Sequence, residues 1–162
     1  MKSWRLAQTF LFVIFFCGGG HSFVASPAET TNGFTVTLRF GGTIALSPEA
    51  TQTLYTNALA LLRSSNFNSR APRWEWKMNA ILEGHRKTIA GDYLLVSFKE
   101  PQAFKTVGGE VSVREIVIGL NRSDYASSLY TIDDELRIVG HSKYSGGLCV
   151  QMLSAVKQIA SR

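Results

Sequence analysis

The chain has 162 residues, of which 45% are hydrophobic and 18% charged, and 17 Lys and Arg stand against 12 Asp and Glu. These values exclude an intrinsically disordered chain, a collagen-like repeat and a bare coiled coil. The two cysteines, Cys17 and Cys149, are too few for a disulfide-stapled miniprotein or a cysteine-built zinc site.

Residues 1–28 have the pattern of a secretory signal. Two basic residues near the start precede an apolar block, FLFVIFFC, which ends at Cys17. This block is shorter than the ~20 residues that a membrane-spanning helix needs, so we predict an export signal rather than a permanent anchor. Cleavage after Gly20 or after Ala28 fits the preference for small residues. Lipid attachment at Cys17 is disfavoured because the bulky Phe16 precedes it.

The predicted export limits the class of partner. An exported protein rarely meets nucleic acid, and the basic residues are spread along the chain with no Lys/Arg stripe between aromatic residues. We therefore expect residues 29–162 to form one secreted or periplasmic domain. We expect it to have no stable membrane span, no nucleic-acid partner, no metal and no cofactor.

The first two elements of this domain have clear signals. The range 34–40 alternates apolar and polar residues, which is typical of a strand with one buried face. Ser47 is then placed to cap a helix whose first residue is Pro48. Apolar residues at helical spacing continue this helix to Arg63, and a polar loop over 64–72 follows.

The segment after this loop fits two structures. Trp74, Trp76 and Met78 alternate as in a strand, whereas Trp74, Met78 and Ile81 share one face of a helix. Aromatic residues favour strands, while Ala and Leu nearby favour a helix. We predict a strand over 73–78, with a helix as the alternative.

The rest of the chain is predicted to be rich in strands until its last helix. Strands are expected over 93–98, 111–120, 128–132 and 136–139, separated by a loop over 101–109, a turn over 121–124 and a hairpin loop over 133–135. Two glycines then precede a helix with apolar residues at helical spacing: Leu148, Met152, Ala155 and Ile159.

These elements predict an α+β domain of two layers. Strands joined by short turns must be antiparallel, because a parallel pair needs a crossover of a dozen or more residues. The expected order is strand, helix, an element that is either strand or helix, four strands and a final helix. We predict a mainly antiparallel sheet of four to five strands with two helices packed on one face.

Cys149 is the first candidate for a chemically reactive side chain. It lies in the first turn of the last predicted helix, where unpaired N–H groups and the helix dipole stabilise a thiolate. His141 is placed to act as its base, and Asp133 or Asp134 to orient that histidine, as in a small secreted thiol enzyme. The alternative is that Cys149 is a small apolar residue packed against the sheet, since cysteine is among the most buried residue types.

Other titratable residues form weaker patterns. His85 and His141 lack the HxxxH or HExxH spacing of a metal site. The acidic run at 133–135 fits a solvated hairpin tip. Glu115 lies within the most apolar strand, where a buried carboxylate needs a partner and would be a candidate for a functional site.

A basic and aromatic segment gives the strongest indication of binding. If Arg73, Trp74, Trp76 and Lys77 are exposed, they make a good contact surface, because Trp and Arg dominate interface hot spots. If they are buried, the tryptophans belong to the core. We predict an exported, non-catalytic binding protein, such as an inhibitor, an immunity-type protein or an accessory module. Its expected partner is a protein or a cell-envelope macromolecule, and the thiol enzyme is the alternative function.

Overall fold

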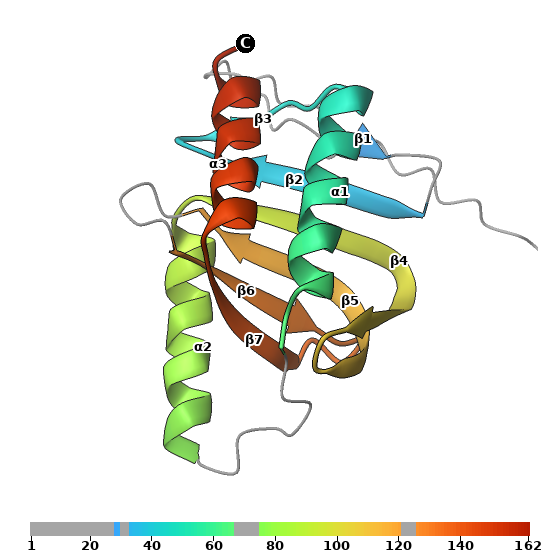
Figure 1. The fold of residues 1–162 in the computed structure, drawn as a ribbon, viewed down its shortest axis with the longest axis vertical. Coiled ribbons are helices and arrows are strands. Elements are labelled where there is room, and N and C mark those ends of the chain that lie inside the picture. The colour runs from blue at the N-terminus through green and yellow to red at the C-terminus, as the bar shows by residue number, and fades with distance from the viewer. Residues whose placement is uncertain (1–27, 30–32, 67–74, 121–125) are drawn as a thin grey trace, which may run out of the picture.

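An antiparallel sheet forms the centre of the molecule (Figure 1). The computed structural model describes residues 28–29, 33–66, 75–120 and 126–162. The strands are β1 (Ala28–Glu29), β2 (Phe34–Arg39), β3 (Thr43–Ile44), β4 (Tyr93–Thr106), β5 (Gly109–Gly119), β6 (Ala126–Ile132) and β7 (Ile138–Ser145). The helices are α1 (Pro48–Arg63), α2 (Glu75–Ala90) and α3 (Gly147–Ala160).

The strand order confirms the predicted fold class. Neighbouring strands follow the order β1-β2-β4-β5-β6-β7, and β3 also pairs with β2. Every one of these pairs is antiparallel. The difference from the prediction of four to five strands and two helices is small, because β1 and β3 have two residues each and the additional helix is α2.

The local sequence explains the first elements. β2 buries Phe34, Val36 and Leu38 on one face of the sheet, as its alternation predicts. The side chain of Ser47 caps α1 by accepting a hydrogen bond from the Ala50 N–H at 3.2 Å. This cap satisfies one of the N–H groups that the first turn of a helix leaves unpaired.

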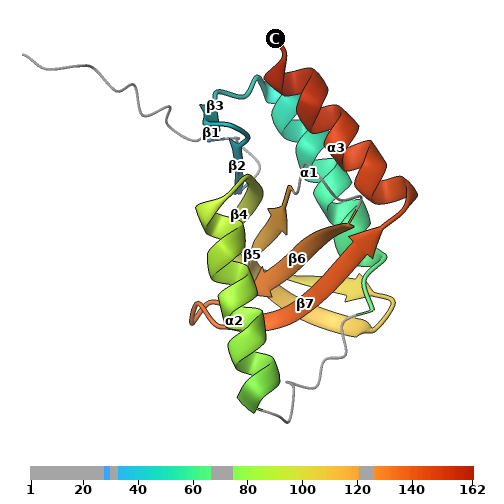
Figure 2. The same ribbon diagram turned by 90° about the vertical axis from the view of Figure 1, so that its left-hand side faces the viewer.

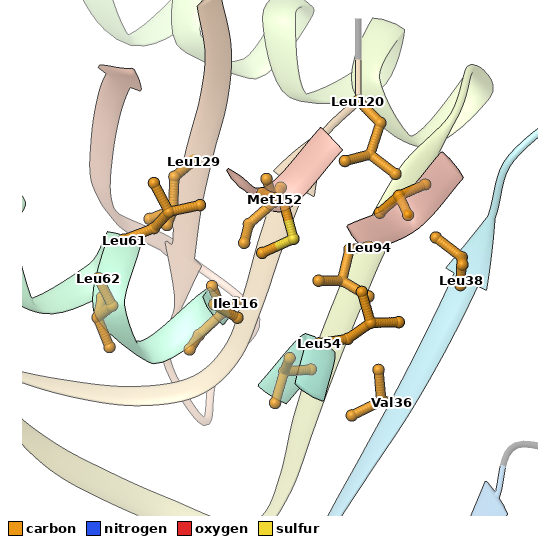
Figure 3. Close-up of a cluster of buried hydrophobic side chains, with 14 of the residues drawn as sticks. Val36, Leu38, Leu54, Leu61, Leu62, Leu94, Ile116, Leu120, Leu129 and Met152 are labelled. Carbon is orange, nitrogen blue, oxygen red and sulfur yellow. The ribbon is translucent and has the colours of Figure 1, made fainter. Parts of the chain in front are cut away.

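α1 and α3 cover one face of the sheet together, as predicted for two helices (Figure 1). Leu54 and Leu61 of α1 meet Met152 of α3 above the aliphatic side chains of the sheet (Figure 3). All three side chains are almost fully buried. This main core also contains buried residues of four strands: Val36, Leu38, Leu94, Val96, Ile116, Ile118 and Leu129.

α2 packs on the opposite face of the sheet (Figure 2). The predicted strand over 73–78 is wrong from its third residue onward, because Glu75–Ala90 is helical. The helix meets the sheet through residues at helical spacing, among them Ile81, Gly84 and Thr88. Two of these are small or polar, so they form no aliphatic stripe. The alternation of the tryptophans, which favours a strand, is therefore a stronger pattern in the sequence than the helical spacing.

β4 and β5 form a hairpin much longer than predicted. The expected loop over 101–109 is wrong for most of its length, because β4 continues to Thr106. The register with β5 shifts between Ser97 and Gln102. Pro101 falls inside this irregularity, where its missing N–H interrupts no ladder hydrogen bond. A proline that reads as a loop signal in the sequence thus lies at a bulge within a strand.

The last hairpin joins β6 to β7. The predicted loop at 133–135 is confirmed, but Leu136 and Arg137 also belong to the turn, and β7 covers Ile138–Ser145 rather than 136–139. Among the residues that the structure describes, no helix is long and apolar enough to cross a bilayer.

The close approach of α2 to the sheet gives a stability prediction. A Cβ at Gly84 would lie 2.8 Å from Tyr130 Oη, and Tyr130 is only 2% exposed. Gly84→Ala should therefore destabilise the fold, although alanine in a helix interior normally gains about 1 kcal/mol over glycine. Urea unfolding of the variant measures the change.

Tyr130→Phe provides the control, because it removes the hydroxyl oxygen that the new Cβ would meet. In the Tyr130→Phe background, Gly84→Ala should recover its gain of about 1 kcal/mol. Stabilisation by Gly84→Ala in both backgrounds would show that α2 does not dock closely at Tyr130.

Candidate functional site

Cys149 is part of the main core. It lies in the first turn of α3, as predicted, but its side chain is only 1% exposed and packs among the residues between α3, α1 and the sheet. A thiol in this position is shielded from solvent, whereas a reactive thiolate needs a partly exposed, electropositive environment. The burial therefore favours the packing role over the nucleophilic one.

His141 faces the other side of the sheet. It is the direct cross-strand partner of Tyr130, and the two rings stack with centroids 4.8 Å apart. Tyr130 belongs to the smaller cluster beneath α2, whereas Cys149 belongs to the main core. The structure therefore does not bring Cys149 and His141 together. Asp133, proposed to orient the histidine, instead contacts Arg137.

The predicted basic and aromatic surface is only partly within the described structure. Arg73 and Trp74 lie outside the described residues. Trp76 and Lys77 fall in the first turn of α2, and their side chains also lie outside the description. A contact role for these four residues stays a prediction.

Two histidine rings enclose Tyr130 beneath α2. His85 of α2 meets it edge-on with ring centroids 5.2 Å apart, and His141 of β7 stacks on it. The Nε2 atom of His85 is buried and has no hydrogen-bond partner among the described residues. Val117 and Ile132 complete the buried part of this cluster. Polar aromatic rings therefore share the contact between α2 and the sheet with aliphatic residues such as Ile81.

Burial shifts the titration of both histidines. Desolvation lowers the pKa of His85, although the charge of Glu115 opposes this shift. Desolvation also lowers the pKa of His141, and the nearby Lys143 adds to the effect. Glu115 is half-buried and accepts a hydrogen bond of 3.4 Å from the hydroxyl of Ser97. No group of three His, Cys, Asp or Glu side chains within the described ranges is placed to hold a metal ion.

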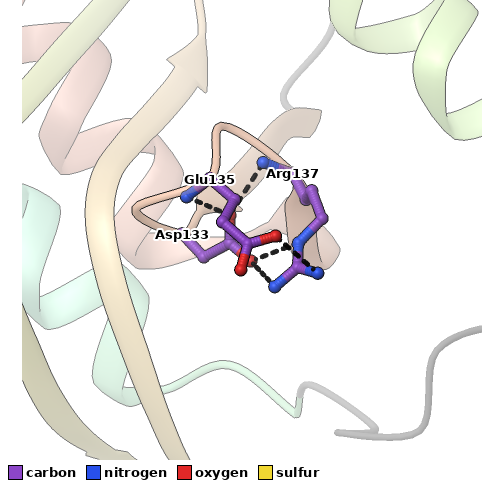
Figure 4. A network of polar contacts seen from close by, with 3 residues as sticks. All are labelled: Asp133, Glu135 and Arg137. Carbon is purple, nitrogen blue, oxygen red and sulfur yellow. Dashed lines mark hydrogen bonds and ion pairs between the residues drawn. The ribbon is translucent and has the colours of Figure 1, made fainter.

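A network of charged residues fixes the turn between β6 and β7 (Figure 4). Asp133 accepts hydrogen bonds from the backbone N–H groups of Glu135 and Arg137, at 3.0 and 2.8 Å. The Nε of Arg137 donates to the same carboxylate at 2.8 Å, and its Nη1 pairs with Glu135 at 2.9 Å. Desolvation of Asp133 opposes ionisation, but the hydrogen bonds and charge of Arg137 lower its pKa overall.

This turn holds Leu136 in an unfavourable position. Its φ angle is 60°, in the left-handed region, and its side chain is 72% exposed. In this region the Cβ of leucine causes a steric cost that glycine does not have. Because the side chain is exposed, it also gains little free energy from burial. The carboxylate of Asp133 accepts three hydrogen bonds from the two neighbours of Leu136, one from Glu135 and two from Arg137. These hydrogen bonds hold the turn in this conformation.

The turn between β4 and β5 is also fixed. The N–H of Val107 donates to the carbonyl of Arg63 at 3.2 Å, and the N–H of Gly108 donates to the carbonyl of Ser65 at 3.3 Å. Arg63 is the last residue of α1 and Ser65 directly follows its C-cap, a region where backbone acceptors lack helical partners. The side chain of Val107 is 73% exposed at this anchored turn.

The two turns lie on either side of one hollow of about 360 Å³. We call this region the hairpin-tip surface and define it as the exposed side chains of Val107 and Leu136 with the lining of the hollow. That lining comes from both hairpins: Thr106, Gly108, Gly109, Glu110, Val111, Ser112, Asp133, Asp134, Arg137 and Val139.

The sequence contained little signal for this surface. The run at 133–135 predicts a turn, but Leu136 was expected to begin a strand and Val107 to lie in a long loop. The two turns share one hollow because the β4–β5 hairpin is long, and the bulge at Pro101 conceals this length in the sequence. Comparison with known proteins adds nothing to this geometry, because no family model, curated protein or solved structure matches the chain.

The burial of Cys149 predicts slow thiol chemistry. In the folded chain, alkylation of Cys149 should be slow from pH 5 to 9, and it should become fast only when denaturant is added. Mass spectrometry of the peptide that contains Cys149 separates its reaction from that of Cys17. Rapid alkylation well below the ordinary thiol pKa of about 8.5 would contradict the packed arrangement and restore the thiol-enzyme alternative.

The two histidines predict a fall in stability at mildly acidic pH. Their folded pKa values lie below the unfolded value of about 6.5, so the unfolded state binds more protons as the pH falls through this range. Stability should be complete above about pH 6.5 and should decrease on acidification towards the lower folded pKa values. Thermal unfolding from pH 7.5 to 5.0 measures this decrease.

The double variant His85→Gln with His141→Gln is the control, and its slope of melting temperature against pH should be clearly smaller. The depressed pKa of Asp133 acts at lower pH, because its unfolded value is already below 4, so it does not mask the effect. An unchanged slope in the double variant would show that the histidines do not control this pH dependence.

Proposed function

We propose that this protein is an exported, non-catalytic binding protein that contacts another protein through the hairpin-tip surface. An inhibitor, an immunity-type protein and an accessory module are all consistent with this function. The observation that carries the proposal is Leu136, an exposed leucine held at a φ of 60° by a buried carboxylate.

The energetic cost at Leu136 supports a role in recognition. A left-handed conformation costs a residue with a Cβ about 1–2 kcal/mol. Strained positions of this kind persist where the surroundings impose them, and they cluster at binding and active sites. Asp133 imposes the turn, yet the leucine side chain contributes almost no burial to the domain. A contact outside the domain would account for this combination.

The fixed backbone of both turns supports the same role. Val107 and Leu136 are exposed aliphatic residues, and hydrogen bonds hold each turn before any partner is present. Side chains on an ordered backbone lose less conformational entropy on binding, which improves affinity. Residues packed at the centre of an interface carry most of its binding energy.

Export remains part of the proposal and is supported by the N-terminal pattern. Of the two cleavage positions, we favour the bond after Gly20. Ala28 and Glu29 form β1 and pair with Val36 and Thr35 of β2. Cleavage after Ala28 would therefore remove half of this short strand. The segment Arg73, Trp74, Trp76 and Lys77 stays a proposed second contact.

A substitution at Leu136 separates binding from folding. Leu136→Gly removes the exposed side chain and relieves the left-handed strain, so stability should stay unchanged or rise by about 1 kcal/mol. Partner contact should fall at the same time. A photoreactive benzoylphenylalanine in place of Val107 measures this contact in the producing cells. It should form a cross-link to one discrete protein, and Leu136→Gly should abolish that cross-link.

Val150 is a matched control, because it is 42% exposed on α3 and does not line the hollow. Val150→Ala should leave the cross-link intact, and the photoreactive residue at position 150 should not form it. The proposal fails if Leu136→Gly leaves the cross-link unchanged, or if positions 107 and 150 give the same products.

A further inference from the structure

We propose that the partner inserts a basic protein segment into the hairpin-tip surface, with an apolar side chain in the hollow and Lys or Arg beside it. This inference rests on the proposed function and specifies the chemistry of the partner. Its basis is the local charge, which is opposite in sign to that of the whole chain.

Carboxylates outnumber cations at the two turns. Glu110, Asp133 and Asp134 line the hollow, and Glu135 lies next to them in the β6–β7 turn. The cations are Arg137 in the lining, Lys105, which is the cross-strand partner of Glu110, and the exposed Arg63, whose backbone carbonyl accepts from Val107. The chain as a whole has a net charge of +5. Within the lining of the hollow three carboxylates stand against one cation, so the hollow is acidic on a basic protein.

The positive charge of Arg137 is paired with carboxylates of its own turn. Its guanidinium pairs with Asp133 at 2.8 Å and with Glu135 at 2.9 Å, and the nearby charge of Asp134 further raises its pKa. Arg137 therefore compensates part of the negative charge of the turn, although its side chain is 65% exposed and lines the hollow. Asp134 and Glu110 add two further carboxylates to the lining, with Lys105 opposite Glu110 across the hairpin. An excess of negative charge steers association and selects a partner of positive charge.

The apolar groups determine the rest of the recognition. Val111 and Val139 line the hollow, while Val107 and Leu136 stand exposed beside it. A volume of about 360 Å³ is at the lower end of the range for ligand pockets and suits one or two side chains rather than an extended cofactor. A polyanion such as nucleic acid, or an anionic membrane surface, would be repelled by the carboxylates.

Three synthetic peptides of identical length test this inference on the full chain. Each carries the same central Leu and Trp residues, with flanking positions occupied by Lys, Gln or Glu. Titration is followed by the backbone amide resonances of the protein. The Lys peptide should shift the resonances of 107–110 and 133–137, and it should bind at least tenfold more tightly than the Glu peptide at low salt.

Charge removal at the hollow provides the matched comparison. The double variant Glu110→Gln with Asp134→Asn should weaken binding of the Lys peptide at least fivefold. Glu100→Gln, which removes an exposed carboxylate that does not line the hollow, should leave binding unchanged. Higher salt should weaken binding to the unaltered protein more than binding to the double variant.

The outcomes separate this inference from the proposed function. If all three peptides shift the resonances of both turns with equal affinity, the surface binds protein segments but the basic partner is wrong. If the peptides shift only resonances outside the two turns, or none at all, both the partner chemistry and the binding role of the hairpin-tip surface are overturned. Selective binding of the Lys peptide that the double variant removes supports both.

Discussion

The pairing of β4 with β5 is the constraint on which the rest of the molecule depends. These strands lie within the sheet between β2 and β6, so they connect the two halves of the antiparallel order. Near Glu115 the hairpin supports both faces, with Ile116 in the main core and Val117 beneath α2. Beyond the register shift it continues to a turn that hydrogen-bonds to the end of α1. One hairpin thus supports both helical layers and the hairpin-tip surface.

The two faces of the sheet differ in chemistry. The face under α1 and α3 is closely packed with aliphatic residues, and Cys149 is one of its small members. The face under α2 is smaller and contains the polar aromatic rings of His85, Tyr130 and His141 beside Val117 and Ile132. The main core is therefore aliphatic, while α2 packs on an interface in which burial lowers the pKa of both histidines.

Much of the fold could be predicted from the sequence, because alternation in β2, the cap at Ser47 and the final apolar helix are local signals. α2 was only the alternative to a predicted strand, and the far half of β4 was expected to be a loop. The helix docks through Ile81, Gly84, His85 and Thr88, of which only Ile81 is aliphatic. Pro101 resembles a loop residue although it lies at a bulge. The hairpin-tip surface could not be predicted either, because the left-handed φ of Leu136 depends on hydrogen bonds that only the folded turn makes.

The central claim is that two turns hold exposed aliphatic side chains in a fixed conformation before any partner arrives. Nitrogen-15 relaxation of the protein without a partner measures this most directly at the amides of Val107 and Leu136. The hydrogen bonds to Arg63, Ser65 and Asp133 predict order parameters of about 0.85, as in the adjoining strands. Values below about 0.6 at either amide would show a mobile tip and would contradict the claim.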